Sequence, residues 1–468
     1  MSWFDTTVHL VYLACATCFV VGLHLMNAPA TARRGNRVSA AGMAVAVLVT
    51  VAVLIHDRET TAWGAIALAA GSVIGAVAGL VAARRVLMTA MPQLVSLFNA
   101  VGGGAAALIA LGDALAHTGE LGTLPVVTTL TTVLDLAIGG VTLSGSLIAA
   151  GKLAGVIPGR PLAVPRWINL VLGAVAVVLA TLFVAGHGGI AALAVIAVAA
   201  LAAGVLLTLP IGGADMPVVI SLLNAFTGTA VAMAGFILDS SALIIAGGLV
   251  GAAGAILTKL MADAMNRSIG AILAGGYGTG DNGAIAVGAG GATRSITAED
   301  AALQLAYANK VVIVPGYGLA AAQAQHEMVA LARALTERGV SVQYGIHPVA
   351  GRMPGHMNVL LAEADAPYEQ LKDLEEINPD FPATDVALVV GANDVTNPAA
   401  RRPGNAVSGM PILDVDRARS VIVIKRSMGQ GYAGIENELY SLPSTAMLFT
   451  DAKAGLAALL AGVREFAS

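Results

Sequence analysis

The feature that most constrains the fold is a series of long apolar segments between Met1 and Met265. About nine of them reach the roughly 20 residues that a helix needs to cross the hydrocarbon core of a bilayer. They are Val8–Met26, Val38–Ile55, Trp63–Ala83, Val86–Leu111, Val126–Gly151, Trp167–Gly186, Ile190–Leu209, Pro217–Leu238 and Ala242–Ala262. From Thr293 onward, charged residues occur in every stretch. The sequence therefore predicts a polytopic α-helical membrane domain followed by a water-soluble domain.

Composition agrees with this division. The chain is 57% hydrophobic and 12% charged, whereas an ordinary soluble protein has about 25% charged residues. A net charge of -4, without a basic patch that carries interleaved aromatic residues, argues against a nucleic-acid-binding protein. Cys15 and Cys18 have CxxC spacing but lie inside the first apolar segment. Because reactive thiolates need polar surroundings, we interpret them as inert helix residues, and we expect no metal site.

Positive charges in the loops predict the orientation of the membrane domain, because cytoplasmic loops are enriched in Lys and Arg. The first, third and fifth loops and the end of the ninth segment carry Arg33, Arg34, Arg37, Arg84, Arg85, Lys152, Arg160, Arg166, Lys259 and Arg267. The opposite side carries only Arg58. We therefore expect the N-terminus outside and the C-terminal domain in the cytoplasm. The N-terminus lacks a basic stretch, which argues against a cleavable signal peptide.

An internal repeat marks the fourth and eighth segments. The residues Met91–Gly103 reappear as Met216–Gly228, which suggests a pseudo-two-fold axis along the membrane normal. Each copy places a Ser and an Asn three residues apart on one helix face: Ser96 and Asn99, then Ser221 and Asn224. An Asn side chain donates and accepts hydrogen bonds, which suits a proton or water path. The alternative, that these residues only tie neighbouring helices together, stays open.

Two acids are functional candidates in the membrane domain. Asp135 lies deep in the fifth segment and Asp215 precedes the eighth. Burying an unpaired acid in a membrane is costly, so such residues usually serve a function. Glycines at GxxxG spacing, in contrast, are expected only to let helices approach closely; these are Gly71, Gly75, Gly79, Gly247 and Gly251.

The second half of the chain begins with a glycine-rich stretch, Gly275–Gly291, that is typical of a flexible tether. We divide the chain into a membrane domain (1–267), a linker (268–292) and a soluble domain (293–468). In the soluble domain Thr297 is expected to cap a helix that runs through Asn309.

A nucleotide fingerprint follows the first predicted strand. Lys310–Val314 is a short β-branched run, and the pattern G-x-G-x-x-A then extends from Gly316 to Ala321, before an amphipathic helix to Arg338. Glycines at such a turn let backbone amides reach a pyrophosphate at the helix N-terminus. The sequence predicts a doubly wound, Rossmann-like parallel sheet.

Later strands indicate which nucleotide is bound. The strand Ser341–Ile346 ends without the acid that holds the ribose 2′-hydroxyl of NAD, which favours NADP. Val386–Val390 leads into Gly391–Asp394, and Val421–Ile424 leads into Lys425, Arg426 and Ser427. Two cations at the carboxyl end of a parallel strand suit a phosphate. The alternative is a solvated basic pair.

Long motifs now carry a family resemblance. Four lie in the soluble domain, Pro315–Glu327, Gly345–Ala364, Gly391–Ala400 and Lys425–Gly434, and two in the membrane domain, Ala214–Gly228 and Gly247–Arg267. They resemble the beta subunit of the proton-translocating NAD(P) transhydrogenase over nearly the whole chain. The resemblance implies hydride transfer from NADH to NADP⁺ coupled to inward proton movement, in a bacterial inner membrane. It also implies an alpha subunit, of one or two chains, that binds NAD(H), and a dimer of such alpha-beta units.

The resemblance also implies roles for residues. Asp394 would lie beside the nicotinamide, and Lys425 and Arg426 on the 2′-phosphate. Asn224 would belong to the proton path, which Asp215 would link to the soluble domain. The implied NADP(H) contacts are Gly316, Tyr317, Gly318, Ala320, Val349, Ala350, Gly351, Arg352, Met353, Gly391, Ala392, Asn393, Asp394, Lys425, Arg426, Ser427, Met428, Gly431, Tyr432, Ala433 and Asp451.

One position departs from the family pattern. Many relatives have a proton-carrying histidine where this chain has Asn99, and asparagine does not titrate near neutral pH. All of His9, His24, His56, His117 and His187 fall near helix ends or in loops. We hypothesise that either Asp135 or a membrane helix of the partner subunit supplies the titratable group.

Two other classes of protein share parts of this pattern. An ion channel or secondary transporter gated by a cytoplasmic nucleotide-binding domain would combine membrane helices with a Rossmann-like domain, but it would need an ion filter or substrate site. A membrane scaffold would leave the nucleotide fingerprint and the basic pair without a use.

Overall fold

The computed structural model describes residues 3–26, 29–56, 61–118, 125–158, 166–187, 189–212, 215–265, 268–273, 293–351, 355–405, 407–429, 431 and 433–466. The chain forms two compact units, one made of most of the first nine helices and one that contains the C-terminal sheet. The predicted linker lies outside the described residues from 274 on, and its first residues form the short helix α10 (Ile269–Leu273).

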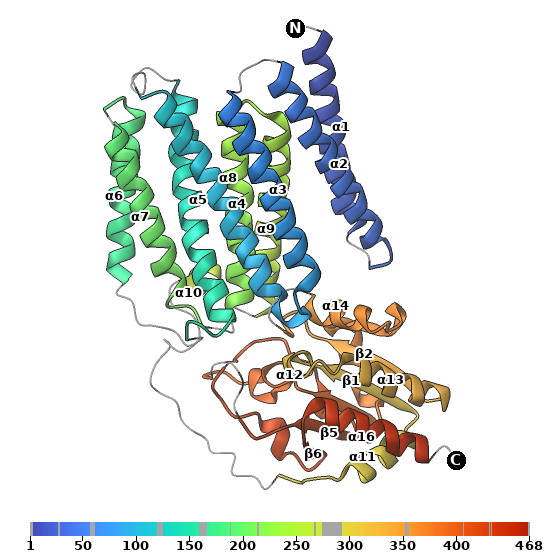
Figure 1. Ribbon diagram of the computed structural model, residues 1–468. Helices are drawn as coiled ribbons and strands as arrows, with labels where there is room; N and C mark the ends of the chain where they lie inside the picture. The colour runs from blue at the N-terminus through green and yellow to red at the C-terminus, as the bar shows by residue number, and fades with distance from the viewer. Residues whose placement is uncertain are drawn as a thin grey trace. The chain divides into compact units, whose positions relative to one another are not determined.

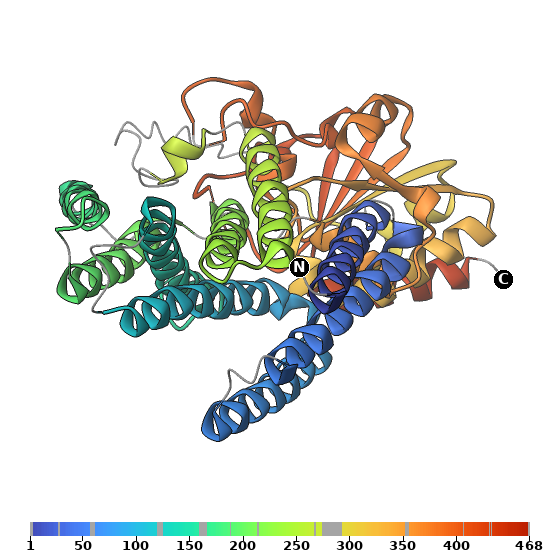
Figure 2. The same cartoon turned by 90° about the horizontal axis from the view of Figure 1, so that it is seen from above.

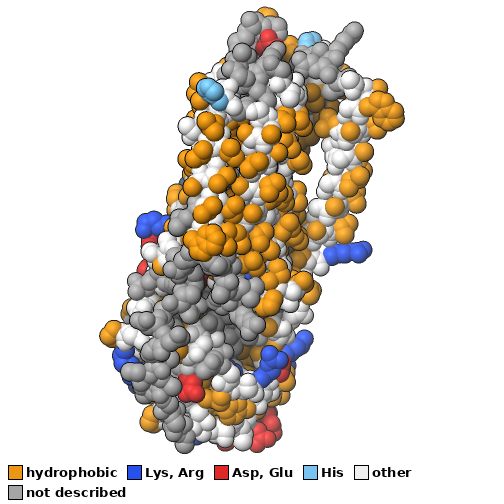
Figure 3. Space-filling model, turned by 90° about the vertical axis from the view of Figure 1, so that its left-hand side faces the viewer, with side chains coloured by type: hydrophobic (Ala, Val, Ile, Leu, Met, Phe, Trp, Pro, Cys, Tyr) orange, Lys and Arg blue, Asp and Glu red, His pale blue; other side chains and the backbone are white. Residues whose placement is uncertain are grey.

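The helical unit confirms the membrane domain (Figure 1). Its long helices are α1 (Trp3–Leu25), α2 (Pro29–His56), α3 (Ala62–Arg85), α4 (Met91–Ala116), α5 (Val126–Leu153), α6 (Arg166–Val184), α7 (Ile190–Thr208), α8 (Met216–Ile237) and α9 (Ser241–Ala264). All except α6, whose described apolar stretch is Val171–Val184, are long and apolar enough to cross a membrane. Hydrophobic side chains cover the visible face of these helices (Figure 3), and Leu48, Ile74 and Val101 are each more than two-thirds exposed. The chain is therefore a membrane protein.

The fourth helix begins later than the apolar pattern predicts. We expected it from Val86, but a short 3-10 turn, η1 (Met88–Ala90), precedes α4, which starts at Met91. Pro92 lies in the first turn, which is where a helix tolerates proline because the amide there has no intrahelical partner.

The two copies of the repeat make equivalent helix contacts. The Ser96 hydroxyl on α4 donates to the Ser146 carbonyl on α5, at 2.8 Å, and the Ser221 hydroxyl on α8 donates to the Gly254 carbonyl on α9, at 3.2 Å. Seven residues further on, a Cβ on Gly103 would lie 2.7 Å from the Thr142 side chain, and one on Gly228 would lie 2.3 Å from the Gly251 nitrogen. Each copy is thus the first helix of a tightly packed pair. Figure 2 shows α4 and α5 side by side, seen from above.

The two GxxxG runs differ in whether another helix packs against them. A Cβ on Gly247 would lie 2.4 Å from the Ala232 nitrogen, so close packing is confirmed for α9 against α8. On α3, a Cβ on Gly71, Gly75 or Gly79 would meet no described atom within 4 Å, and no described residue of α3 is buried. The close packing expected for α3 is therefore not found within the described part of this chain.

The second unit contains a six-stranded, all-parallel sheet in the order β3-β2-β1-β4-β5-β6, which confirms the doubly wound prediction. The strands are β1 (Lys310–Pro315), β2 (Ser341–Ile346), β3 (Leu371–Asp373), β4 (Val386–Val390), β5 (Ser420–Lys425) and β6 (Thr445–Phe449). Strand β1 pairs with β2 on one side and with β4 on the other, so the strand order reverses between β1 and β4. Doubly wound sheets bind ligands at this switch point, outside the carboxyl ends of the strands.

Both faces of the sheet are covered. On one side α11 (Ala298–Ala306), α13 (Gln325–Glu337) and α16 (Ala452–Glu465) pack together. Thr297 caps α11 as predicted, since its hydroxyl accepts from the Asp300 amide. On the other side, buried valines of β1, β4 and β5 form a core with Phe381, Leu413 and Tyr440 from the connecting segments.

The helix predicted after the fingerprint is broken into two. The structure has a short helix, α12 (Tyr317–Ala321), and then α13. Between them Gln323 has a φ of 51°, in the left-handed region that interrupts a right-handed helix.

Candidate functional site

Two glycines bring the loops after β1 and β4 into backbone contact. The Gly316 amide donates to the Val390 carbonyl and the Gly318 amide to the Gly391 carbonyl, each at 2.9 Å. A Cβ on Gly316 would lie 2.4 Å from the Ala392 Cα, and one on Gly318 would lie 2.7 Å from the Gly391 Cα. Only glycine allows this approach. The two amides therefore hold the loops together, and any amide that reaches a pyrophosphate must come from elsewhere in the turn.

Lys425 lies at the end of β5, and its side chain contacts a backbone carbonyl and an aromatic ring. Its ammonium nitrogen donates to the Gly429 carbonyl at 2.5 Å and lies 4.6 Å from the centroid of the Tyr440 ring. Burial lowers the pKa of Lys425, and the nearby charge of Asp394 acts in the opposite direction. The buried Tyr440 hydroxyl in turn donates to the Ala392 carbonyl at 3.2 Å.

Asn393 joins this cluster through its side-chain amide. In the orientation that satisfies its neighbours, its oxygen accepts from the Gly431 amide at 2.7 Å and from Lys425 at 3.2 Å. Its nitrogen then donates to the Tyr440 hydroxyl at 3.1 Å. The loops after β4 and β5 are therefore connected through side chains as well as through the sheet.

Asp394 is held by the chain that follows β5. One carboxylate oxygen accepts from the Ala433 amide at 3.0 Å. A Cβ on Gly431 would lie 2.2 Å from the other oxygen, so this position must be glycine for the carboxylate to stay in place.

These loops surround a cavity of about 280 Å³. Among the predicted residues, its lining includes Gly318, Gly391, Ala392, Asn393, Lys425, Arg426, Ser427 and Asp451. Arg426 forms no ion pair with any described residue. A phosphate group suits this lining, because it would meet one guanidinium and one ammonium beside a glycine turn. Asp451 instead caps α16, since its carboxylate accepts from the Lys453 amide at 3.0 Å.

Other predicted cofactor contacts are placed differently. Val349, Ala350 and Gly351 form the turn after β2, where Gly351 has a φ of 108°. Ala320 is fully buried inside α12, whereas Met428 is half-exposed. Arg352, Met353 and Tyr432 lie outside the described residues.

Sequence reasoning missed Tyr440 and His347. Both are buried polar side chains that join two loops of the soluble domain. Tyr440 lies 15 residues after Lys425, and no local spacing connects them. The position of His347 could have identified it as a candidate, since it directly follows the predicted strand Ser341–Ile346.

In the membrane unit, the two repeated asparagines differ. The buried Asn99 side chain donates to the Ile220 carbonyl on α8, at 3.2 Å. Asn224 is half-buried, and its side chain makes no hydrogen bond to a described residue. The tie between helices thus accounts for Asn99, while Asn224 keeps its hydrogen-bonding capacity.

The two acids are both fully buried. Asp215 lies directly before α8. Asp135 lies on α5, and neither of its carboxylate oxygens has a hydrogen-bond partner among the described residues. The same helix carries further buried hydroxyls at helical spacing, those of Thr131, Thr132, Thr142 and Ser146. Asp135 is therefore part of a polar stripe along α5.

Comparison with known proteins gives a consistent result. The sequence model of one family, described as NAD(P) transhydrogenase beta subunit, matches residues 8–462. Two curated relatives are 49% identical to this chain over 452 residues, which is 94% of this chain and 96% of each relative. Both are named NAD(P) transhydrogenase subunit beta, and both come from Rhodospirillum rubrum, one of them from a designated strain.

Proposed function

The chain belongs to the NAD(P) transhydrogenase beta subunit family, and from this premise we propose that it supplies the NADP(H) site and most of the proton path of a membrane transhydrogenase. The family implies that the enzyme uses nicotinamide nucleotides, and the name beta subunit implies an alpha-subunit partner. In the proposed reaction, hydride passes from NADH to NADP⁺ while a proton moves inward across the membrane. The chain carries one nucleotide fingerprint, so the partner would bind NAD(H).

The observation that carries the cofactor assignment is the position of Lys425 and Arg426. Lys425 ends β5 and Arg426 follows it, at the carboxyl edge of the sheet, and both line the cavity beside the β1/β4 switch point. A planar guanidinium and an ammonium together suit a 2′-phosphate, the group that distinguishes NADP from NAD.

This position also supports a proposal for the direction in which the cofactor lies. Lys425 and Arg426 lie on the far side of the switch point from β2. The phosphorylated ribose is therefore proposed over β5, and the turn Val349–Gly351 after β2 would serve the opposite end. With the phosphorylated ribose over β5, an acid after β2 would not contact it, so the absence of that acid does not distinguish NADP from NAD.

Asp394 is proposed as the acid beside the nicotinamide, the ring that accepts the hydride. The Ala433 amide fixes its carboxylate, and the opposite charge of Lys425 interacts with it. Tyr432 and Arg352 remain proposed contacts by their motif positions.

For the proton path we propose Asn224, Asp215 and the polar stripe of α5. Asn99, which is tied to α8, would line the path without carrying the proton. Asp135 is one candidate for the titratable group, and an acid or histidine on a membrane helix of the partner is the other. We further propose an inner-membrane location with the soluble domain in the cytoplasm, in a dimer of alpha-beta units.

The test is a titration of the full chain in detergent with NADP⁺ and, separately, with NAD⁺. We expect preferential binding of NADP⁺, weakened at least about tenfold by Lys425→Ala or Arg426→Ala because each removes a charged phosphate contact. Arg419→Ala is the matched control, since Arg419 directly precedes the opposite end of the same strand and pairs with Asp385. Equal or preferential binding of NAD⁺ would instead overturn the assignment of NADP(H) to this chain.

A further inference from the structure

His347 directly follows β2 and uses both of its ring nitrogens. It is 1% exposed. One nitrogen, Nδ1, lies 3.2 Å from the Val349 amide, which can only donate. The other, Nε2, lies 2.7 Å from the Pro411 carbonyl, which can only accept. Both contacts are met only by a neutral imidazole that carries its proton on Nε2.

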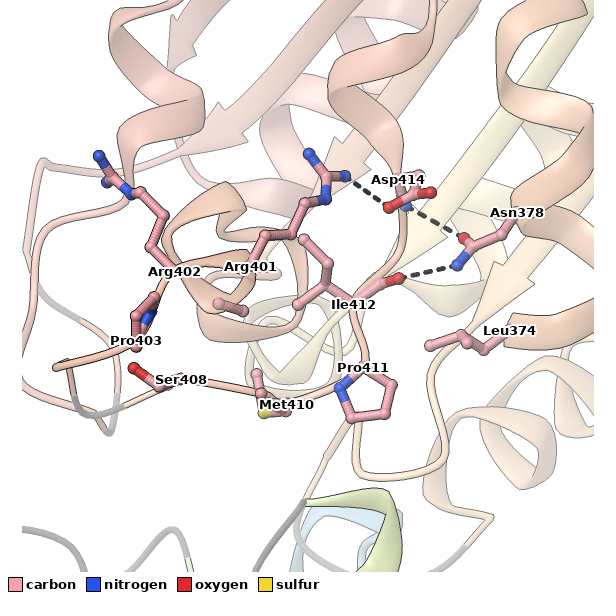
Figure 4. A pocket seen from close by; sticks show the side chains of 12 residues that line it. Leu374, Asn378, Arg401, Arg402, Pro403, Ser408, Met410, Pro411, Ile412 and Asp414 are labelled. Atoms are coloured by element: carbon pink, nitrogen blue, oxygen red, sulfur yellow. Dashed lines mark hydrogen bonds and ion pairs between the residues drawn. The ribbon is translucent and has the colours of Figure 1, made fainter.

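The Pro411 carbonyl belongs to a firmly anchored segment (Figure 4). The Asn378 side chain donates to the Ile412 carbonyl at 2.9 Å and accepts from the Asp414 amide at 3.1 Å. The Leu413 amide donates to the Val395 carbonyl at 2.9 Å. Since Val395 directly follows Asp394, this segment is tied to the loop after β4.

His347 itself begins the tight turn after β2. The Ala350 amide donates to the His347 carbonyl at 2.9 Å. At the other end of the turn, a Cβ on Gly351 would lie 2.5 Å from Nδ1 of His356, so His356 closes the turn on that side. The turn is short and internally bonded, and in the described residues the His347 ring connects it to the Pro411 segment.

We propose that His347 is a positioning residue for the NADP(H) site, whose Nε2–H···O bond to Pro411 sets the spacing between the turn Val349–Gly351 and the segment anchored beside Asp394. This inference rests on the proposed function, because the turn and Asp394 are both assigned to the cofactor there. Burial also lowers the pKa of His347 to about 4, which keeps the ring neutral at physiological pH.

Two substitutions separate the bonds that the ring makes. In asparagine the side-chain oxygen occupies the δ position, so His347→Asn can still accept from the Val349 amide but cannot reach Pro411. In glutamine the side-chain nitrogen occupies the ε position, so His347→Gln can still donate to Pro411. The proposal requires the NADP⁺ affinity of His347→Gln to stay closer to wild type than that of His347→Asn. If His347 only stabilised the turn, His347→Asn would be the variant closer to wild type.

The experiment uses the full chain in detergent, with NADP⁺ as the probe and equilibrium dialysis as the measurement. We expect His347→Asn to bind NADP⁺ about tenfold more weakly, or about 1.4 kcal/mol, and His347→Gln to bind within about threefold of wild type. Thermal unfolding of each variant shows whether it is folded. Binding by His347→Asn as tight as wild type, or tighter than by His347→Gln, overturns the proposal.

Hydrogen–deuterium exchange without nucleotide separates this proposal from the proposed function. In His347→Asn, peptides that span residues 347–351 should exchange faster than in wild type, and in His347→Gln they should not. Failure of wild type to bind NADP⁺ would contradict the cofactor assignment alone. Unchanged exchange in His347→Asn would contradict the positioning role, whatever the nucleotide result.

Discussion

The ammonium nitrogen of Lys425 lies 3.4 Å from the hydroxyl oxygen of Tyr440 and 4.6 Å from the centroid of its ring. A cation this close to an aromatic face is stabilised by about 0.5–2 kcal/mol, depending on burial. Tyr440 is itself held by the Ala392 carbonyl on the loop after β4. The direction in which Lys425 points is therefore set by a residue that need not touch the nucleotide.

Tyr440 substitutions test this relationship. Tyr440→Phe removes the hydroxyl bonds and keeps the ring, so we expect NADP⁺ affinity to fall about threefold to tenfold. Tyr440→Leu also removes the cation–π contact and should weaken binding further. Nucleotide titration of the two full-length variants gives the answer, and equal affinities would show that the ring contributes nothing to Lys425.

Gly431→Ala tests the seat of Asp394. Its Cβ would lie 2.2 Å from the carboxylate, so either Asp394 or the backbone must move. Overpacking of this kind costs about 1–3 kcal/mol, and we expect hydride transfer by the assembled enzyme to fall by at least about tenfold. The comparator is Gly429→Ala, where the nearest atom would be the Ser427 hydroxyl at 3.5 Å. If the two variants lose activity equally, crowding of Asp394 is not the cause.

His347 predicts a pH dependence of stability. Its folded pKa, about 4, lies below the value of about 6.5 expected in the unfolded chain. Between these values the unfolded state binds the proton and the folded state does not, so stability falls as pH drops from about 6.5 to 4, by up to about 3 kcal/mol. Unfolding of wild type and His347→Gln across this range measures it, because glutamine does not titrate. Parallel profiles would rule out a buried neutral histidine.

The carboxylate of Asp385 titrates in a different pH range from His347 and therefore serves as a comparison within the same experiment. The amides of Asn309 and Lys310 lower the pKa of Asp385. Its contribution is therefore present above about 4 and is lost as pH falls through the folded value. The two groups act in different pH ranges, so their effects can be separated.

Asp135→Asn tests the proton path. If Asp135 is the titratable group, the amide cannot carry a proton, and translocation should fall by about a hundredfold. The assay is dye-reported proton uptake by vesicles that contain the chain and its partner. Asp113→Asn is the control, because Asp113 lies on α4 beside His117 near the helix end. Intact translocation in Asp135→Asn would leave the partner subunit as the source.

Periodicity and turn chemistry predicted most of the fold, because both are local. The membrane helices, four of the strands and the Thr297 cap follow from apolar runs and their flanking residues. Strand β3 has three residues, Leu371–Asp373, which is too short for any pattern to register. The break at Gln323 was also unpredictable, because a residue with no special turn preference adopts a positive φ there.

The site was predictable only where its residues follow strands. Gly316, Asp394, Lys425 and Arg426 lie in the loops that follow predicted strands, and the parallel sheet brings the carboxyl ends of strands to one edge. The partners that orient these residues could not be predicted, since they meet through tertiary packing. Tyr440 and the Pro411 carbonyl are examples.

The two repeated helix pairs of the membrane domain share one contact and differ in another. Ser96 and Ser221 make the same contact in both copies, but only the first asparagine is engaged, with Ile220 of the second copy. Among the described residues, Asn224 makes no such bond. A duplicated hairpin of this kind permits a division of labour, in which one copy keeps the scaffold and the other is free to evolve chemistry.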